Sequence, residues 1–344
     1  MKLCDYLTIS GIVIYLQKSK EKSMRTSLKD TLEKTKILVI DGSMSTALEA
    51  MGLDLSNKLW SATALIEHPE KIKEVHKYYF RAGAQCGITC SYQASIPGLM
   101  EAGYSEQEAE DYIRLSVELF KQARQEWWDE EASEEDIWPL CLGAVGPYGA
   151  YLADGSEYKG QYKISDEELR HFHKRRIELL WEAGADLILF ETDPSLKEAL
   201  IEADLAEELG VDYWISFSCR DDLHTYEGQS IKECALALNN HPHLQMIGVN
   251  CTYPTHIENL ILTLTKYADV PVAVYPNSGD IYDPQTKTWS PNKDHVSFKE
   301  YALLWMKAGA KGVGGCCTTK AEHISDIKKA KEIYLSDQVK KIKF

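Results

Sequence analysis

The sequence predicts an α/β protein that consists of one (β/α)8 TIM barrel domain. From Lys36 onward, eight short β-branched runs alternate with longer amphipathic segments, and eight such units fit a chain of 344 residues. The runs are apolar almost throughout, which is typical of parallel strands buried on both faces. The tripeptide Ala-Gly-Ala recurs at 82–84, 183–185 and 308–310, where a glycine can end a helix just before the next strand.

Local signals support the individual elements in chain order. The predicted strands span 37–40, 84–89, 139–145, 186–190, 213–218, 245–249, 270–275 and 309–313. Between them, Pro69 suits the first turn of a helix, and Ser105 and Ser165 open capping-box patterns. The predicted helices span 69–82, 105–128, 165–183, 195–209, 256–267 and 297–308. A doubly wound open sheet is the alternative, but the sequence lacks the glycine-rich phosphate loop that normally follows its first strand.

Composition and charge narrow the classes of partner. The net charge of -15 argues against nucleic acid or an anionic membrane as a partner, and it leaves small molecules as the expected ligands. Nine cysteines without regular spacing do not form a secreted disulfide pattern, so a reducing cytoplasm is the predicted location. The apolar stretch 6–16 is too short to span a membrane and lacks a signal-peptide cleavage site.

The N-terminal residues match nothing in the repeating pattern. A basic run from Lys18 to Arg25 follows the apolar stretch, and the first predicted strand begins only at residue 37. Met24 is therefore the predicted natural start. Residues 1–23 are interpreted as a disordered or non-native extension, and residues 24–344 as the barrel domain.

Three cysteines stand at the ends of two predicted strands. Cys251 follows the sixth strand, and Cys316 and Cys317 follow the eighth. Adjacent strand residues point to opposite faces, so two neighbouring thiols reach one ion only if the backbone leaves strand geometry. The pair Gly314-Gly315 is predicted to provide this freedom, because glycine tolerates positive φ. The thiols could be inert core residues, but together they favour a three-cysteine zinc site with one open position, which is a catalytic arrangement.

The chemistry of such a site points to sulfur as the acceptor atom. Three thiolates make Zn²⁺ a poor Lewis acid for producing hydroxide, but the site can keep a substrate thiol deprotonated and nucleophilic. Asp41 and Glu191, after the first and fourth strands, suit an α-ammonium group, and backbone amides near Gly42 and Thr89 suit a carboxylate. The predicted substrate is a small thiol amino acid. Asp41 could instead belong to a helix cap, and Asn250 could be a turn residue.

Five motifs identify a family at this point. They are Asp41-Gly42-Ser43-Met44-Ser45-Thr46, Leu59-Trp60-Ser61-Ala62, Thr89-Cys90-Ser91-Tyr92-Gln93-Ala94-Ser95, Gly248-Val249-Asn250-Cys251 and Gly314-Gly315-Cys316-Cys317. Over residues 36–333 the chain resembles the homocysteine S-methyltransferase family. The zinc-binding barrel of that family also occurs in betaine–homocysteine methyltransferase and cobalamin-dependent methionine synthase.

The resemblance implies a role for each matching residue. The implied zinc ligands, which carry the catalysis, are Cys251, Cys316 and Cys317. The acidic residues that hold the amino group of homocysteine match Asp41 and Glu191. The groups around its carboxylate match Gly42, Ser61 and Thr89, and Asn250 sits beside the first zinc ligand.

The methyl donor is indicated by the long segment 146–158. It looks like the branch that uses S-methylmethionine, with S-adenosylmethionine as a poorer donor. Betaine enzymes differ there, and this chain has Gln93 where they have a tyrosine. Trp60, Tyr92 or Tyr148 could face the sulfonium by cation–π attraction, and packing is an equal alternative for each of them. The extra domains of cobalamin methionine synthase are absent from the sequence.

The resulting hypothesis is zinc-dependent methyl transfer from a sulfonium to the thiol of L-homocysteine, which gives methionine. The alternatives are methyl transfer to selenocysteine or another thiol on the same fold, a barrel lyase or hydrolase without metal, and a non-catalytic binding protein. The oligomeric state and the preferred donor in the cell stay open.

Overall fold

A ring of eight parallel strands forms the centre of the computed structural model, which describes residues 5–9, 12–16, 25–55, 61–283, 288–290 and 296–342. The strand order is β3-β12-β9-β8-β7-β6-β5-β4, and an isolated parallel bridge between Ile40 and Cys86 joins the two ends. The strands are β3 (Leu38–Val39), β4 (Cys86–Ile88), β5 (Leu140–Val145), β6 (Leu187–Asp193), β7 (Tyr213–Phe217), β8 (Leu244–Asn250), β9 (Val272–Tyr275) and β12 (Gly312–Val313). The predicted (β/α)8 barrel is confirmed, with all eight strands in the expected segments.

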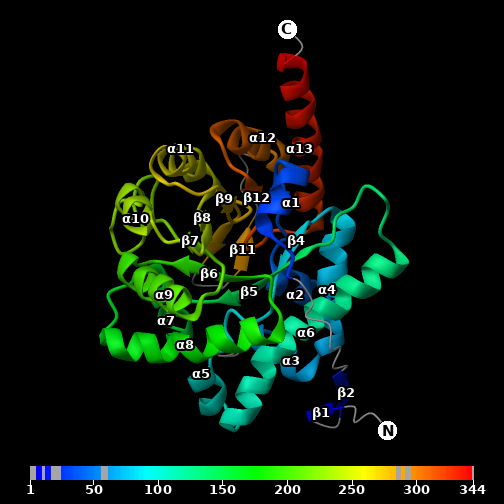
Figure 1. Cartoon of the computed structure of the whole chain (residues 1–344), viewed down its shortest axis with the longest axis vertical. Helices are drawn as coiled ribbons and strands as arrows, with labels where there is room; N and C mark the ends of the chain where they lie inside the picture. The colour runs from blue at the N-terminus through cyan, green and yellow to red at the C-terminus, as the bar shows by residue number, and fades with distance from the viewer. Residues whose placement is uncertain are drawn as a thin grey trace.

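Helices surround this ring (Figure 1). The six predicted ones are α4 (Pro69–Ala82), α6 (Glu106–Glu130), α8 (Asp166–Ala183), α9 (Leu196–Leu209), α11 (Ile257–Tyr267) and α12 (Phe298–Ala308). Ser105 and Ser165 make the expected capping boxes, and the pattern around Ser297 forms another. The helical prediction is therefore confirmed to within two residues at each end of these six elements.

Other helices were not predicted. They are α1 (Leu28–Thr35), α2 (Met44–Ala50), α3 (Ala62–Glu67), α5 (Ile96–Glu101), α7 (Tyr148–Leu152), α10 (Ile231–Leu238) and α13 (Ala321–Ile342), with the 3-10 turns η1 (Ser156–Tyr158) and η2 (Pro254–His256). Helices α10 and α13 complete the fifth and eighth units of the barrel. Ile324, Ile327 and Ala330 bury one face of α13, whose far end extends away from the barrel (Figure 1).

The side-chain alternation of the strands divides the core into two layers. On β6, Leu187 and Leu189 belong to the apolar cluster inside the ring, whereas Ile188 and Phe190 pack in the cluster under the helices. The same alternation gives Glu191 the inward side, one step beyond Leu189. A carboxylate is thus delivered to the carboxyl end of the barrel, the face where barrel enzymes carry their active sites.

The opposite end of β6 is held by a buried ion pair. Asp186 Oδ2 accepts hydrogen bonds from Arg124 Nη1 and from the N–H of Cys141, both at 2.8 Å, and Asp186 Oδ1 accepts from the N–H of Thr26 at 2.8 Å. Asp186 is 5% exposed and Arg124 6%. This carboxylate therefore ties α6, β5 and the segment before α1 to the bottom of the barrel.

Replacing Asp186 with alanine is expected to lower the free energy of unfolding by about 3–5 kcal/mol, because a buried guanidinium loses its counter-charge. Urea denaturation measures the effect. Glu134→Gln removes a charge at an exposed position, and its effect should stay within about 0.5 kcal/mol. An unchanged urea midpoint in Asp186→Ala would show that the pair does not hold the barrel bottom.

Two short pairs of strands are separate from the eight-stranded ring. Strands β1 (Asp5–Ile9) and β2 (Ile12–Leu16) pair antiparallel, as do β10 (Ile281–Asp283) and β11 (Thr288–Ser290). Much of the extension predicted over residues 1–23 lies outside the described residues, and its interpretation stays a prediction. Among the described helices, none has the length and apolar character required to cross a membrane.

Candidate metal centre and substrate cavity

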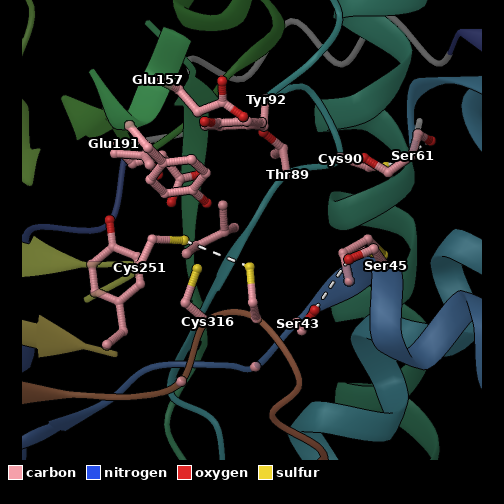
Figure 2. Close-up of a pocket in the computed structure, with 18 residues that line it drawn as sticks. Ser43, Ser45, Ser61, Thr89, Cys90, Tyr92, Glu157, Glu191, Cys251 and Cys316 are labelled. Atoms are coloured by element: carbon pink, nitrogen blue, oxygen red, sulfur yellow. Dashed lines mark hydrogen bonds between the residues drawn. The ribbon is translucent and has the colours of Figure 1, made fainter. Parts of the chain in front are cut away.

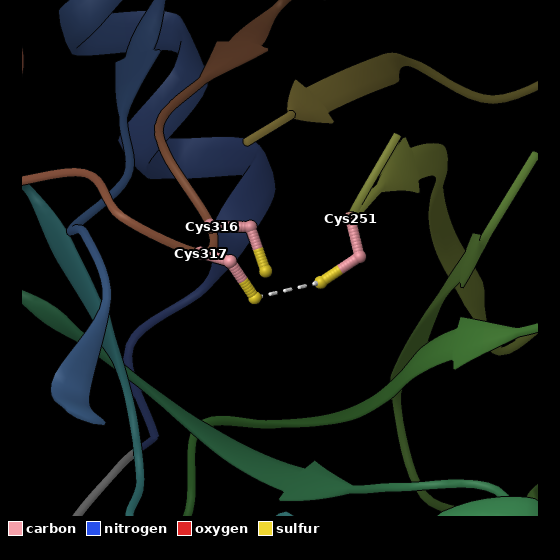
Figure 3. Close-up of side chains that lie close together, drawn as sticks. All are labelled: Cys251, Cys316 and Cys317. Atoms are coloured by element: carbon pink, nitrogen blue, oxygen red, sulfur yellow. Dashed lines mark hydrogen bonds between the residues drawn. The ribbon is translucent and has the colours of Figure 1, made fainter. Parts of the chain in front are cut away.

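The three predicted cysteine ligands lie together at the carboxyl end of the barrel. Cys251 directly follows β8, and Cys316 and Cys317 stand in the turn after β12 (Figure 3). The Sγ atoms of Cys251 and Cys317 are 3.7 Å apart, and all three Sγ atoms lie within 4.8 Å of one another. Two thiols that are 66 residues apart in sequence, Cys251 and Cys317, therefore meet at one point in space.

The backbone leaves strand geometry at residues other than the predicted glycines. Cys251 has a φ of 45° and Thr318 a φ of 64°, whereas Gly314 and Gly315 have no positive φ. The glycines are needed for close packing, because a Cβ on Gly314 would lie 2.5 Å from Ile40 Cβ. The predicted role of the glycine pair is therefore wrong. The strained conformations fall on side-chain-bearing residues at the site, where such strain commonly occurs.

Hydrogen bonds fasten the turn that carries Cys316 and Cys317 to the neighbouring strand. The N–H of Cys316 donates to the carbonyl of Pro276 at 2.7 Å, and the N–H of Ser278 donates to the carbonyl of Cys317 at 3.1 Å. The Thr319 hydroxyl donates to the carbonyl of Cys316 at 2.6 Å. The two thiols are thus pre-positioned by the fold.

The donor set fits a zinc ion. Zn–S bonds of about 2.3 Å at tetrahedral angles place neighbouring sulfurs about 3.8 Å apart, close to the separation of Cys251 and Cys317. Hydrogen bonds with the other two thiols hold the pKa of Cys317 well below its ordinary value. Three thiol ligands would leave a fourth position open toward the adjoining cavity.

That cavity brings together groups from most of the barrel loops (Figure 2). Its lining consists of Gly42, Ser43, Met44, Ser45, Ser61, Ile88, Thr89, Cys90, Tyr92, Glu157, Tyr158, Glu191, Thr192, Cys251, Tyr275, Gly315, Cys316 and Cys317. The predicted residues Gly42, Ser61, Thr89 and Glu191 therefore share one cavity with the three cysteines. Asp41 and Asn250 lie next to it rather than in its lining.

Glu191 presents a buried carboxylate to this cavity. It is 6% exposed, and burial raises its pKa to about 8, with a further contribution from the charge of Cys251. Tyr275, beside it, has its own pKa raised by burial and by Glu191. A carboxylate in this setting is stabilised by a cationic ligand, so Glu191 is suited to receive an ammonium group.

Asp41 lies just below the cavity, 2% exposed. Its Oδ2 accepts a hydrogen bond from the N–H of Ile88 at 3.0 Å, while Oδ1 is buried without a hydrogen-bond partner. Burial raises the pKa of Asp41 well above its ordinary value, and the nearby Glu191 raises it further. Helix α2 is capped by Ser43 instead, so the alternative role of Asp41 as a cap is not seen.

Asn250 forms hydrogen bonds with two residues that line the cavity, Thr192 and Cys316. Its Oδ1 accepts from the N–H of Thr192 at 2.8 Å, and its Nδ2 donates to the Thr192 hydroxyl at 2.8 Å and to Cys316 Sγ at 3.9 Å. Thr192 has a φ of 66°, a strained value for a β-branched residue. Asn250 thus holds the turn after Glu191 and one thiol, and the side chain itself does not line the cavity.

The amide of Thr89 is engaged within the barrel. Its N–H donates to the carbonyl of Leu142 at 2.9 Å, and its hydroxyl accepts from the N–H of Ala144 at 2.9 Å and lies 2.7 Å from Ser91 Oγ. The Thr89 amide itself is therefore engaged within the barrel, and the binding of a substrate carboxylate by backbone amides near Gly42 and Thr89 stays a prediction. Gly42 lines the cavity against Tyr79, whose ring would clash with any Cβ at that position.

The candidate aromatic residues differ in their placement. Tyr92 lines the cavity, whereas Tyr148 packs against Tyr151, Tyr162 and Phe172 on the outer side of the barrel. Trp60 lies outside the described residues.

Two cavity residues, Glu157 and Tyr158, were not singled out from the sequence, although they belong to the segment 146–158. Both come from η1, which folds back over the thiols. The charge of Cys251 is the main cause that raises the pKa of Tyr158 well above its ordinary value. The sequence did contain a signal that could have identified them: an acidic residue next to an aromatic residue in the long loop after the third strand.

Comparisons with known proteins agree with this geometry. A family profile described as homocysteine S-methyltransferase matches residues 38–331. The chain is 46% identical over 302 residues to homocysteine S-methyltransferase YbgG of Bacillus subtilis. The matched region covers 87% of this chain and 96% of the relative. It is 42% identical over 311 residues to homocysteine S-methyltransferase of Escherichia coli, and this match covers 89% of the chain and 99% of the relative.

Solved structures show the same barrel. The metallated form of the homocysteine methyltransferase MmuM from Escherichia coli superimposes with a TM-score of 0.80 at 39% identity, covering 88% of this chain and 99% of that one. The family match spans most of the chain and includes every strand of the ring. The chain belongs to the homocysteine S-methyltransferase family.

Proposed function

We propose that the protein transfers a methyl group from a sulfonium donor to the thiol of L-homocysteine, with S-methylmethionine as the preferred donor and Zn²⁺ as the cofactor. The observation that carries this proposal is the convergence of three thiols and the Glu191 carboxylate on one cavity. Family membership and the metallated state of the MmuM structure support the acceptor and the metal.

The cysteines would hold the metal, and the carboxylates would orient the acceptor. Held by Cys251, Cys316 and Cys317 with its fourth position open, Zn²⁺ would keep a substrate thiol deprotonated and nucleophilic. Glu191 and the unpartnered oxygen of Asp41 are suited to bind the α-ammonium group of homocysteine. These contacts fix the amino acid so that its sulfur lies at the thiol cluster.

Methyl transfer then requires the donor to approach along the line of the bond that forms. The homocysteine sulfur forms a new S–CH3 bond as the S–CH3 bond of the sulfonium breaks, and the donor leaves as a neutral thioether. The acceptor proton is released before the transfer. With S-methylmethionine, both products are methionine. Because a sulfonium is already a good leaving group, the chain mainly contributes positioning and exclusion of water.

Methionine formation tests the whole proposal. The purified protein is incubated with homocysteine and, separately, with S-methylmethionine, S-adenosylmethionine or betaine, each with and without a zinc chelator. We expect the fastest turnover with S-methylmethionine and loss of turnover with chelator. If metal-loaded protein forms no methionine from any donor, the proposed reaction is wrong, and selenocysteine and other thiols become the acceptors to examine.

A further inference from the structure

We propose that Glu157 is the donor-recognition residue, whose carboxylate pairs with the positive charge of the methyl donor above the thiol cluster. This inference rests on the proposed sulfonium-dependent reaction and adds the residue that selects its second substrate. Glu157 is half-buried in the cavity lining, and its Oε2 atom is buried without a hydrogen-bond partner. A carboxylate that lines a cavity and has one oxygen without a hydrogen-bond partner is a group prepared for a cationic ligand.

The position of Glu157 suits a donor rather than the acceptor. Figure 2 shows its carboxylate beside Tyr92, across the cavity from Cys251 and Cys316. Glu191 lies nearer to Cys251 in the same view. The cavity thus has one carboxylate close to the thiol cluster and another on its far side, as two substrates that meet at sulfur require.

The surroundings of Glu157 favour a cation of low hydration. The tyrosines Tyr92 and Tyr158 line the same region, and aromatic faces attract sulfonium and ammonium groups. Among the described residues that line the cavity, none is lysine, arginine or histidine. Burial raises the pKa of Glu157, and the charge of Cys251 raises it further. Both effects are relieved when a cation binds beside the carboxylate.

The loop around η1 is anchored, so the carboxylate keeps its position. A Cβ on Gly149 would lie 2.5 Å from the backbone N of Glu157, so only glycine permits this approach. The Ser218 hydroxyl lies 3.4 Å from the Glu157 carbonyl that it donates to, and the N–H of Gln161 donates to Glu227 Oε1 at 2.6 Å. The end of η1 is thereby fixed to the loop that follows β7.

A buried ionic cluster holds the start of the same loop. Glu198 Oε1 accepts from the N–H of Tyr148 at 2.6 Å and lies 2.9 Å from His173 Nε2. Arg176 Nη2 donates to the carbonyl of Gly146 at 2.6 Å and lies 3.2 Å from His173 Nδ1. Both ring nitrogens of His173 are therefore engaged by side chains of the chain itself. The cluster, which α8 and α9 carry, thus fixes the first residues of the loop that follows β5.

This geometry predicts which kinetic constant depends on Glu157. The sulfonium charge is largest in the bound donor and disappears as the methyl group leaves, so a nearby carboxylate stabilises the ground state at least as well as the transition state. Its removal should raise the KM for the donor and leave kcat little changed. S-methylmethionine carries a net positive charge and betaine carries none, so the carboxylate also favours the sulfonium donor.

The variant Glu157→Gln is expected to raise the KM for S-methylmethionine about 10- to 100-fold, while the dissociation constant of homocysteine measured without donor stays unchanged. Asp154→Asn is the matched control. It removes one charge from the same loop at an exposed position, and asparagine can still accept the hydrogen bond from the N–H of Ser156. This control should keep the wild-type KM.

Competitive inhibition by trimethylsulfonium separates two positive charges of the donor. If its inhibition constant rises in Glu157→Gln as the KM does, the carboxylate pairs with the sulfonium. If only the KM for S-methylmethionine rises, it pairs with the α-ammonium group. A wild-type KM in Glu157→Gln, in an assay where the unchanged protein turns over S-methylmethionine, overturns this inference alone. Absence of turnover in the unchanged protein would instead count against the proposed function.

Discussion

Cys317→Ser is expected to abolish both metal retention and methionine formation. A hydroxyl is a much poorer zinc ligand than a thiolate, and Cys317 is the thiol whose pKa the other two hold lowest. We expect zinc content to fall from about one per chain to near zero, with turnover at least about 1,000-fold lower. Elemental analysis of the purified protein and the methionine assay measure the two effects.

Cys234→Ser provides the matched comparison. This cysteine is fully buried, but it lies on α10 and does not line the cavity. It should keep its metal and its turnover, even if its stability falls somewhat. Full activity of Cys317→Ser at one metal per chain would show that the thiol cluster is not the metal centre.

The second large effect is expected at the carboxylates. Asp41→Asn and Glu191→Gln each remove an acceptor charge and keep the side-chain size, so the ammonium group of homocysteine would lose a buried counter-charge. Losses of about 2–5 kcal/mol are usual for such pairs, which corresponds to about 30-fold or more in affinity. Titration calorimetry with homocysteine and metal-loaded protein measures the change directly.

The zinc content and the KM for the methyl donor are the control measurements for these two variants. Zinc content should remain about one per chain, because neither carboxylate is a metal ligand in the proposed site. The KM for S-methylmethionine at saturating homocysteine should stay close to that of the unchanged protein. If both variants bind homocysteine with the affinity of the unchanged protein, the two carboxylates do not take part in binding the acceptor.

The fold could be predicted because each barrel unit carries its own local signal. Strands such as β5 are apolar on both faces, and helices such as α8 begin with a capping box and end at a glycine. Helix α10 was missed because it spans only eight residues, and α13 because it follows the last strand, where no further strand marks its end.

The thiol cluster could be predicted because parallel strands bring their carboxyl ends to one face of a barrel. Details that depend on backbone conformation could not. The positive φ values fall at Cys251 and Thr318 instead of the glycine pair, and the Thr89 amide is occupied by Leu142. Both outcomes depend on contacts between segments far apart in the sequence, which no local pattern encodes.

The loop that carries Glu157 was the hardest part of the cavity to predict. Tyr148 and Glu157 lie in one loop, yet the first packs outside the barrel and the second enters the cavity. The direction of each side chain depends on where Arg176, Glu198 and Glu227 hold the loop, and these anchors come from other parts of the chain.

The separation between the two sides of the cavity has a consequence for how such enzymes diversify. The proposed acceptor groups stand at the ends of β3, β6, β8 and β12, which the barrel itself requires. The proposed donor-side residues Glu157 and Tyr158 stand on one excursion between β5 and α8. Insertions or substitutions within that excursion can change the methyl source while the thiol-activating half is inherited intact. New donor specificities can therefore arise in this scaffold by local change.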